Sequence, residues 1–364
     1  MVRIRAWWWV AAVVWLLQAC ATTPRPATDE SWIFAILPDT QLYARSHPDI
    51  FAAQTRWLGE HGQELGAPFV LHLGDVVQRP EHADQWRTAS SAMRTLEDAG
   101  LSYAIAPGNH DVLDPDEIDR WRDHPSEPYP ERFSPDRAAQ QAGFVARGPF
   151  GFSEAYRVAR NGETVLVLAL GWRPGAETLA WAESLLAAHP CTPTIVITHA
   201  LLVPGEEEPT IGSLAGPLWQ AFLRHHDQIL MVFNGHYAGD AWRIEPNAAG
   251  HPVLLAVIDY QHLDHGGGGY LQLWRLDFDD EAIETLALSP WVQDPLDADD
   301  PTAPGLVPPF GEPIRRIPFP LTRRWAQIRD QAPGSVPVDG PAAWQRLRAR
   351  LRQASAMRSE DAGR

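Results

Sequence analysis

The stretch Tyr103-Ala104-Ile105-Ala106-Pro107-Gly108-Asn109-His110-Asp111 runs from an apolar segment directly into a polar loop. The apolar residues favour a buried strand, and the Gly-Asn pair favours a turn. The loop therefore places an amide oxygen, an imidazole and a carboxylate at a strand end, where ligands commonly bind in α/β sheets. An ordinary turn with polar neighbours is the alternative. As a site, the loop can bind a metal ion and donate a proton.

Four other apolar segments end in the same way, each in side chains that can bind a metal ion. They are residues 33–38 before Asp39-Thr40-Gln41, 69–73 before Gly74-Asp75, 194–198 before His199, and 229–234 before Gly235-His236. Because strand ends open into a cleft, five such ends predict one shared site. A mixed set of Asp, Asn and His suits Mn, Fe or Zn better than Ca.

Between these motifs, strand-like and helix-like patterns alternate, which predicts a parallel α/β half. Helices are expected near residues 50–66, 84–99, 177–188 and 216–224, and a hairpin at Asn161-Gly162. Later strand-like segments, at 242–244, 253–258, 270–278 and 283–288, are separated by short turns and favour antiparallel pairing. We therefore expect two sheets packed face to face with helices outside.

In order and spacing, the five motifs resemble the calcineurin-like metallophosphoesterase family, whose pattern is D-x-H, G-D, G-N-H-[DE], H and G-H-x-H. The resemblance extends from about Asp39 to Gly239. It implies an α/β fold that is a four-layer αββα sandwich of two mixed sheets flanked by helices. It also implies two divalent metal ions, of Mn, Fe, Zn or Mg, and hydrolysis of phosphoesters by in-line attack of a hydroxide that bridges them.

The resemblance also assigns the metal ligands. Asp75 would bridge the two ions, and all residues of the second metal position are present: Asp75, Asn109, His199 and His236. The first position keeps Asp39, but Gln41 replaces the His of D-x-H and Ala238 replaces the second His of G-H-x-H. Gln41 can ligate through its carbonyl oxygen, whereas Ala238 cannot ligate. We therefore expect a weak, exchangeable or Mg/Mn-preferring first site.

The same resemblance implies the catalytic residues. His110 would protonate the leaving group or stabilise its charge. Asp111 would hold the His110 imidazole and raise its basicity. Four further residues are candidates for repairing the first metal position or lining its rim: Tyr237, Asp240, Gln78 and His265. For each of them a role as an ordinary surface or loop side chain is the alternative.

We place the core domain at residues 31–290. One segment within it and two segments outside it depart from its pattern. Residues 113–150 are rich in Pro and charged residues and are expected to form an insertion or lid. Residues 291–364 are expected to be a Pro-rich extension that carries an amphipathic helix near 342–353 and a disordered end. Residues 20–30 are expected to be a tether.

The N-terminus resembles a bacterial lipoprotein signal peptide. Basic residues precede an apolar run at 6–17, and Cys20 follows. We expect removal of residues 1–19, lipidation of Cys20 and a lipid-anchored protein of the bacterial cell envelope, on the periplasmic face of the outer membrane. An uncleaved membrane anchor with an incidental Cys is the alternative. The remaining cysteine is Cys191, so no intrachain disulfide is expected.

The charge of the chain limits its partners. The formal net charge is −16 and the pI is about 5.3, which argues against a nucleic-acid partner. A small phosphoester remains the expected substrate, either a monoester or a diester, and the sequence leaves the oligomeric state open. The alternative function is a metal-binding scaffold lipoprotein that has kept the fold and lost turnover, because Gln41 and Ala238 depart from the family pattern.

Overall fold

The structure is a computed structural model that describes residues 32–66, 68–160, 162–292 and 314–329. The expected signal peptide, the lipidation at Cys20, the tether and the expected helix near 342–353 lie outside these residues. Within the described part of the chain, no helix is both long enough and apolar enough to cross a lipid bilayer.

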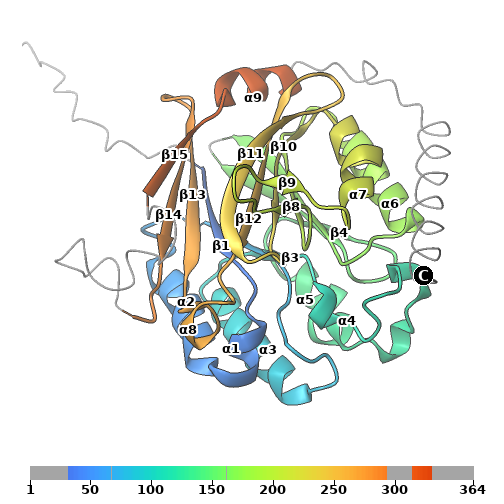
Figure 1. Ribbon diagram of the computed structural model, residues 1–364, viewed down its shortest axis with the longest axis vertical. Helices are drawn as coiled ribbons and strands as arrows, with labels where there is room; N and C mark the ends of the chain where they lie inside the picture. Colours follow the sequence, from blue (N-terminus) through green and yellow to red (C-terminus); the bar gives the residue numbers. More distant parts are fainter. Residues whose placement is uncertain (1–31, 67, 161, 293–313, 330–364) are drawn as a thin grey trace, which may run out of the picture. The chain divides into compact units, whose positions relative to one another are not determined.

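Two large mixed sheets form the centre of the described chain (Figure 1). The first has the strand order β15-β14-β13-β1-β2-β3. Strands β1, β2 and β3 pair in parallel, and β13, β14 and β15 extend the sheet in antiparallel pairing from β1. Their bounds are β1 (Trp32–Leu37), β2 (Phe69–His72), β3 (Tyr103–Ile105), β13 (Leu271–Asp277), β14 (Ala282–Leu288) and β15 (Ile314–Pro318).

The second sheet has the order β11-β12-β10-β7-β6-β5-β4. Its bounds are β4 (Phe144–Arg147), β5 (Glu154–Arg160), β6 (Glu163–Leu170), β7 (Thr194–Thr198), β10 (Ile229–Asn234), β11 (Gly239–Pro246) and β12 (Pro252–Asp259). β5 and β6 pair in antiparallel orientation with Arg160 opposite Glu163, as the hairpin expected between them requires. Strands β8 (Leu202–Val203) and β9 (Thr210–Ile211) form a small separate ribbon.

The strands expected to be antiparallel after residue 241 divide between the two sheets. β11 pairs with β12 in the second sheet, and β13 pairs with β14 in the first. The expected antiparallel pairing is confirmed for both of these pairs, and β12 in addition runs parallel to β10, which lies on its other side. This parallel neighbour brings the end of β12 to the same sheet edge as the end of β10.

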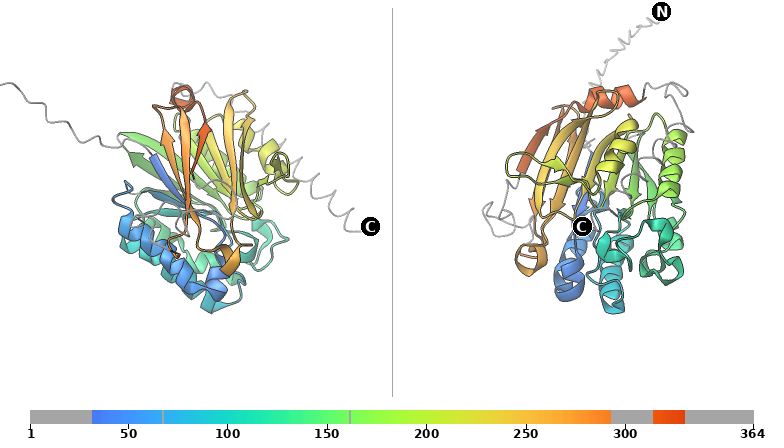
Figure 2. Two further views of the ribbon diagram at one scale, coloured as in Figure 1. Left: turned by 60° about the vertical axis from the view of Figure 1, so that its left-hand side comes forward. Right: turned by 45° about the vertical axis from the view of Figure 1, so that its right-hand side comes forward.

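Helices cover both outer faces of the sheet pair (Figure 1, Figure 2). Side chains alternate along β1, so that Phe34 and Ile36 pack between the sheets while Ala35 and Leu37 face the helices. The first sheet is covered by α1 (Gln41–Ser46), α2 (Pro48–His61) and α3 (Ala83–Asp98), and the second by α6 (Ala176–Ala188) and α7 (Gly216–Ala221). The predicted four-layer αββα sandwich is confirmed.

The expected insertion, residues 113–150, consists of short elements. They are the 3-10 turns at Asp119–Trp121 and His124–Ser126, α4 (Pro128–Arg132), α5 (Pro135–Ala139) and β4. Side chains of Asp119 and Arg122 are among those that hold the insertion onto the domain. The Asp119 carboxylate accepts hydrogen bonds from Gly175 N and Thr178 Oγ1 at the start of α6, and the Arg122 guanidinium donates to the Trp172 carbonyl oxygen.

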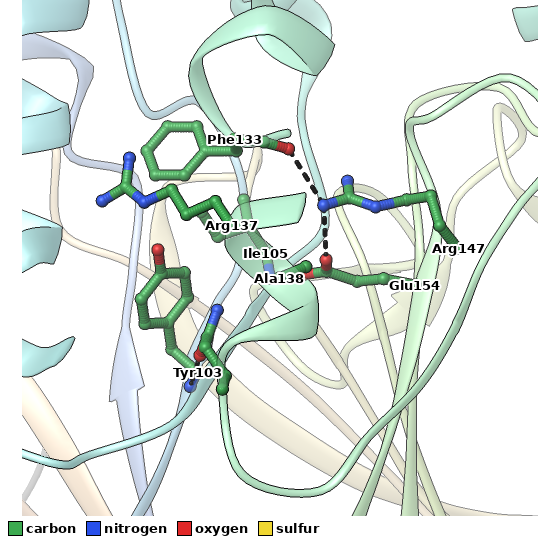
Figure 3. Close-up of a pocket in the computed structure, with 8 residues that line it drawn as sticks. Tyr103, Ile105, Phe133, Arg137, Ala138, Arg147 and Glu154 are labelled. Carbon is green, nitrogen blue, oxygen red and sulfur yellow. Dashed lines mark hydrogen bonds and ion pairs between the residues drawn. The ribbon is translucent and has the colours of Figure 1, made fainter. Parts of the chain in front are cut away.

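A small pocket lies between the insertion and strands β3 and β5 (Figure 3). Arg147 forms an ion pair of 3.0 Å with Glu154 there and donates a hydrogen bond to the Phe133 carbonyl oxygen. Both charged side chains are buried. None of the predicted ligands at the strand ends lines this pocket, so it lies outside the predicted site.

The first sheet continues beyond residue 290. β15 pairs with β14 from Ala282 to Leu286, and α9 (Leu321–Arg329) follows β15. Trp325 and Ile328 of α9 pack into the core between the sheets, where the Trp325 ring lies 5.8 Å from that of Trp32. Residues 314–329 therefore belong to the same packed unit as the core domain.

Candidate metal centre

The structure brings together the residues predicted for the second metal position. Ligand atoms of Asp75, His199 and His236 all lie within 4.8 Å of one another. Each residue lies just beyond the end of a strand, after β2, β7 and β10 respectively. Asn109 completes the group, with its Oδ1 atom 3.2 Å from Nε2 of His199.

The imidazole of His199 is held in the orientation that a metal ligand requires. Its Nδ1 atom lies 2.8 Å from the carbonyl oxygen of Leu73, which can accept the ring proton. The other nitrogen, Nε2, then carries a lone pair and faces Asp75 Oδ2 and Asn109 Oδ1, each at 3.2 Å. Burial lowers the pKa of His199, but the charge of Asp75 together with its hydrogen bond outweighs this effect and raises it, so the site favours a positive charge at Nε2, either a proton or a metal ion.

Asp75 lies between the two predicted metal positions. Its Oδ1 atom accepts a hydrogen bond of 2.9 Å from the backbone N–H of His110. Its Oδ2 atom lies 3.2 Å from His199 Nε2 on one side and 3.2 Å from Gln41 Nε2 on the other. This placement suits a carboxylate that bridges two cations.

The backbone around the cluster is strained where the ligands require it. Asp75 and His236 both have positive φ values, 48° and 66°, which non-glycine residues rarely adopt and which cluster at functional sites. At Gly108, an added Cβ would lie 2.2 Å from Asp75 Oδ1 and 2.6 Å from His199 Nε2. Only glycine allows the loop to approach these two ligands so closely.

The first metal position is rich in buried oxygen atoms. Asp39, at the end of β1, is buried and accepts the backbone N–H of His236 at 3.1 Å. Burial, the charge of Asp259 and the charge of Asp75, in that order, raise the pKa of Asp39 well above its usual value. The side chain of Gln41 is also buried, and its Oε1 atom has no hydrogen-bond partner.

Asp259 begins a loop that the sequence places within reach of the cleft, in a structural or rim role, and it was not predicted as a ligand. Asp259 is the last residue of β12 and is buried, and its burial raises its pKa. Its carboxylate accepts two hydrogen bonds from Gln261, one from the backbone N–H and one from Nε2. The signal was present in the sequence, because the apolar segment 253–258 ends in Asp259 just as the other five segments end in ligands.

The role expected for Asp111 is wrong. Its oxygens accept hydrogen bonds from the backbone N–H groups of Val77 and Gly108, at 3.0 and 2.8 Å. Asp111 thus holds two loops of the site in place. The His110 imidazole is held instead by Gln78, whose backbone carbonyl oxygen and side-chain amide both lie 3.0 Å from Nδ1. If that carbonyl oxygen accepts the Nδ1 proton, Nε2 of His110 is the free nitrogen.

The remaining candidates have other places in the structure. Asp240 is bound to Arg315 at 2.6 Å and to Gln272 at 2.7 Å, in a polar network between the sheets. The His265 ring packs against those of His47 and Trp291, at 5.5 and 5.1 Å.

Two aromatic rings flank His236. The Tyr237 ring is 4.6 Å from it, and the ring of Trp172, a residue that sequence reasoning also missed, is 5.3 Å from it. The Trp172 indole N–H donates to the Pro115 carbonyl oxygen and so ties the expected insertion to the wall of the site.

These residues fit a pair of divalent cations. The second position combines imidazole nitrogens with carboxylate and amide oxygens, a set that intermediate transition metals accept. The first position offers carboxylate oxygens and one unpartnered amide oxygen, which hard cations prefer. Within the described part of the chain, no arginine forms an ion pair with Asp39, Asp75 or Asp259, and Asp75 is paired with His199, so a bound cation would compensate the remaining negative charge.

Comparisons with known proteins find a curated bacterial relative. The chain is 28% identical over 276 residues to the uncharacterized protein YvnB of Bacillus subtilis (strain 168); the match covers 74% of this chain and 21% of that protein. The chain thus spans about a fifth of the length of that relative.

Solved structures similar to this one include a dimetal phosphatase from Danio rerio and GAP50 from Plasmodium. The phosphatase is 11% identical with a TM-score of 0.46, and the match covers 71% of this chain and 96% of the phosphatase chain. GAP50 is 10% identical with a TM-score of 0.49 and covers 84% and 99%.

A purple acid phosphatase from yellow lupin is 16% identical, with a TM-score of 0.44, and the match covers 71% of this chain and 52% of the lupin chain.

The model of the family described as calcineurin-like phosphoesterase matches residues 34–240, which are more than half of the chain. This range contains all five motifs and ends at the start of β11. By this match, the chain belongs to the calcineurin-like phosphoesterase family.

Proposed function

We propose that the chain is a hydrolase of small phosphoesters that works with two divalent cations. One observation carries the proposal, namely the convergence of His199 Nε2, Asp75 Oδ2 and Asn109 Oδ1 in a buried site. Membership of the calcineurin-like phosphoesterase family supports the same reaction class. When bound, the cations would supply Lewis-acid activation of water and neutralise the charge of the phosphate.

In such a reaction, different residues of the chain would bind the cations and transfer the proton. Asp75, Asn109, His199 and His236 would hold one cation, and Asp39, Gln41 and Asp75 would contribute to the other. His110 is half-buried at the edge of this group. Its backbone N–H donates to Asp75, and its Nδ1 atom contacts the carbonyl oxygen of Gln78. When the ring carries a proton on both nitrogens, its Nε2 atom is the one that would give a proton to the leaving oxygen. Asp111 and Gly108 fix the loop on which His110 lies.

The test is hydrolysis of nitrophenyl phosphate and of bis(nitrophenyl) phosphate by the metal-stripped chain, reloaded with Mn²⁺, Mg²⁺, Zn²⁺ or Fe²⁺. We expect turnover of at least one ester with at least one cation, and the ratio between the two esters separates a monoesterase from a diesterase. If an ion binds and no cation restores turnover, the chain is a metal-binding scaffold, and the proposal is refuted.

We further propose that the protein is a lipid-anchored component of the bacterial cell envelope. The sequence supports this, because a basic start, an apolar run and Cys20 form a lipoprotein-type signal. Expression with a labelled fatty acid should label the wild-type protein and leave the Cys20→Ser variant unlabelled. Equal labelling of both proteins would refute the anchor, without bearing on the hydrolase.

A further inference from the structure

The first metal position lacks both histidines of the family pattern, and a neighbouring strand brings a carboxylate to the same place. Ala238, which stands where the second His of G-H-x-H would be, immediately precedes Gly239, the first residue of β11. Gly239 pairs directly with Asp259 at the end of β12. A side chain from β12 is therefore available one residue away from the missing ligand.

The position of Asp259 relative to the other ligands is fixed by the parallel pairing of β10 and β12. Asn234 pairs with Val257. His236 and Asp259 each follow two residues later, so both leave the sheet at the same edge. Asp39 accepts a hydrogen bond from the backbone N–H of His236, and burial together with the nearby charge of Asp259 raises the pKa of Asp39. Asp39, Asp75 and Asp259 are each about 1% exposed.

A second observation points to a ligand for this acidic group. Gln41 is 1% exposed, and its Oε1 atom is buried without a hydrogen-bond partner. Its Nε2 atom donates to Asp75 Oδ2 at 3.2 Å and to Gln261 Oε1 at 2.5 Å. A buried acceptor without a partner destabilises the fold, and a bound cation would remove this cost.

Gln261 explains why the oxygen of Gln41, and not its nitrogen, is left free. The Nε2 atom of Gln261 donates to Asp259 Oδ2 at 2.9 Å, so its Oε1 atom must face Gln41 and accept from the Gln41 amide. Gln261 is thus a positioning residue. Its hydrogen bonds orient both the Asp259 carboxylate and the Gln41 amide. Supporting bonds of this kind are typical of metal sites.

We propose that Asp259 takes the place of the missing histidines, so that the first metal position is an all-oxygen site formed by Asp39, Gln41, Asp75 and Asp259. Hard cations such as Mg²⁺ and Mn²⁺ prefer oxygen ligands, whereas the second position, with two imidazoles, suits Zn²⁺ or Fe²⁺. The two positions therefore differ in metal preference. The inference rests on the two-cation site of the proposed function, and it is tested by metal binding rather than by turnover.

The experiment is a calorimetric titration of the metal-stripped chain with Mn²⁺, together with low-temperature EPR of the spin-coupled Mn pair. The wild-type chain should bind two Mn²⁺ and show the coupled signal. Asp259→Asn should weaken one of the two sites at least tenfold and abolish the coupled signal, while the other site keeps its affinity. Addition of Zn²⁺ to the wild-type chain loaded with two Mn²⁺ should displace a single Mn²⁺.

Two further variants make the test specific. Asp240→Asn removes a neighbouring carboxylate of β11 that contacts Arg315, and it should leave both Mn²⁺ sites intact. The triple variant Gln41→His, Ala238→His, Asp259→Asn restores the histidines of the family pattern, and it should recover two sites and accept two Zn²⁺. The thermal unfolding of each variant, measured by circular dichroism, verifies that it is folded.

The inference is overturned if Asp259→Asn, folded as the wild type, binds two Mn²⁺ with unchanged affinities. It is also overturned if Asp240→Asn loses a site instead, or if Zn²⁺ displaces both Mn²⁺ ions equally. Each of these results leaves the hydrolase proposal standing if turnover is present. Conversely, two sites that depend on Asp259, in a chain without turnover, would uphold the inference and refute the hydrolase.

Discussion

The Nδ1 atom of His199 lies 2.8 Å from the carbonyl oxygen of Leu73, on the strand end that also carries the Gly74-Asp75 motif. This single hydrogen bond selects the tautomer that leaves Nε2 as an electron-pair donor toward Asp75 and Asn109. The scaffold of two adjacent sheets thus prepares a metal ligand before any metal is bound.

Replacement of His199 should remove one cation. His199→Gln is expected to lower the bound metal, measured by elemental analysis, by one ion per chain, and to lower the rate of ester hydrolysis by at least about tenfold. The exposed residue His225, changed in the same way to Gln, is the matched control and should keep the wild-type metal content. Full metal content in His199→Gln would contradict the assignment.

Gly108→Ala should block the site by a steric effect alone. The φ of Gly108 is −95°, which any residue adopts, but its Cβ would lie 2.2 Å from Asp75 Oδ1 and 2.6 Å from His199 Nε2. We therefore expect a folded protein whose metal affinity is at least about tenfold lower. Gly216→Ala, at the start of α7 with open space around its Cβ, is the control and should bind metal as the wild type does.

His110→Asn should lower turnover and spare the metal. Loss of a general acid typically costs about 10²–10⁴-fold in rate. The loss should be larger for alkyl phosphoesters than for nitrophenyl esters, because a poor leaving group depends more on protonation. Metal content should stay at the wild-type level. An equal loss with both classes of ester would show that His110 does not protonate the leaving group.

The buried pair of Arg147 and Glu154 gives a pH-dependent prediction far from the motifs. Burial raises the pKa of Glu154 even beside Arg147, which lies 3.0 Å away. Arg147→Met should cost about 3–5 kcal/mol of unfolding free energy at pH 8, because the carboxylate is left buried and unpaired.

The cost of Arg147→Met should shrink in acid. A raised pKa means that the folded protein binds the proton of Glu154 at a pH where the unfolded chain has released it. The stability of the variant is therefore highest near the unfolded pKa of about 4.3 and falls as the pH rises toward the folded value. Urea unfolding at pH 5 and pH 8 measures this. The double variant Arg147→Met, Glu154→Gln should lose the pH dependence; if it does not, Glu154 is not the titrating group.

The sequence by itself determined the layered architecture and most of the second metal position. Apolar segments that alternate with amphipathic ones leave few ways to bury both faces of two sheets, and strand ends then place Asp75, Asn109, His199 and His236 together. Local rules were enough because each of these residues lies within four residues of the end of its own strand. The same rule, extended to residues 253–258, would have included Asp259.

Only the tertiary structure decided the composition of the first metal position and the partner of His110. Asp259 reaches the site because β12 lies parallel to β10, and a contact between strands that are not joined by one hairpin is not encoded in local spacing. Likewise, Asp111 is adjacent to His110 in sequence, but a 3-10 turn directs its carboxylate to the backbone N–H groups of Gly108 and Val77. The His110 imidazole contacts Gln78 instead, a residue 32 positions earlier in the chain.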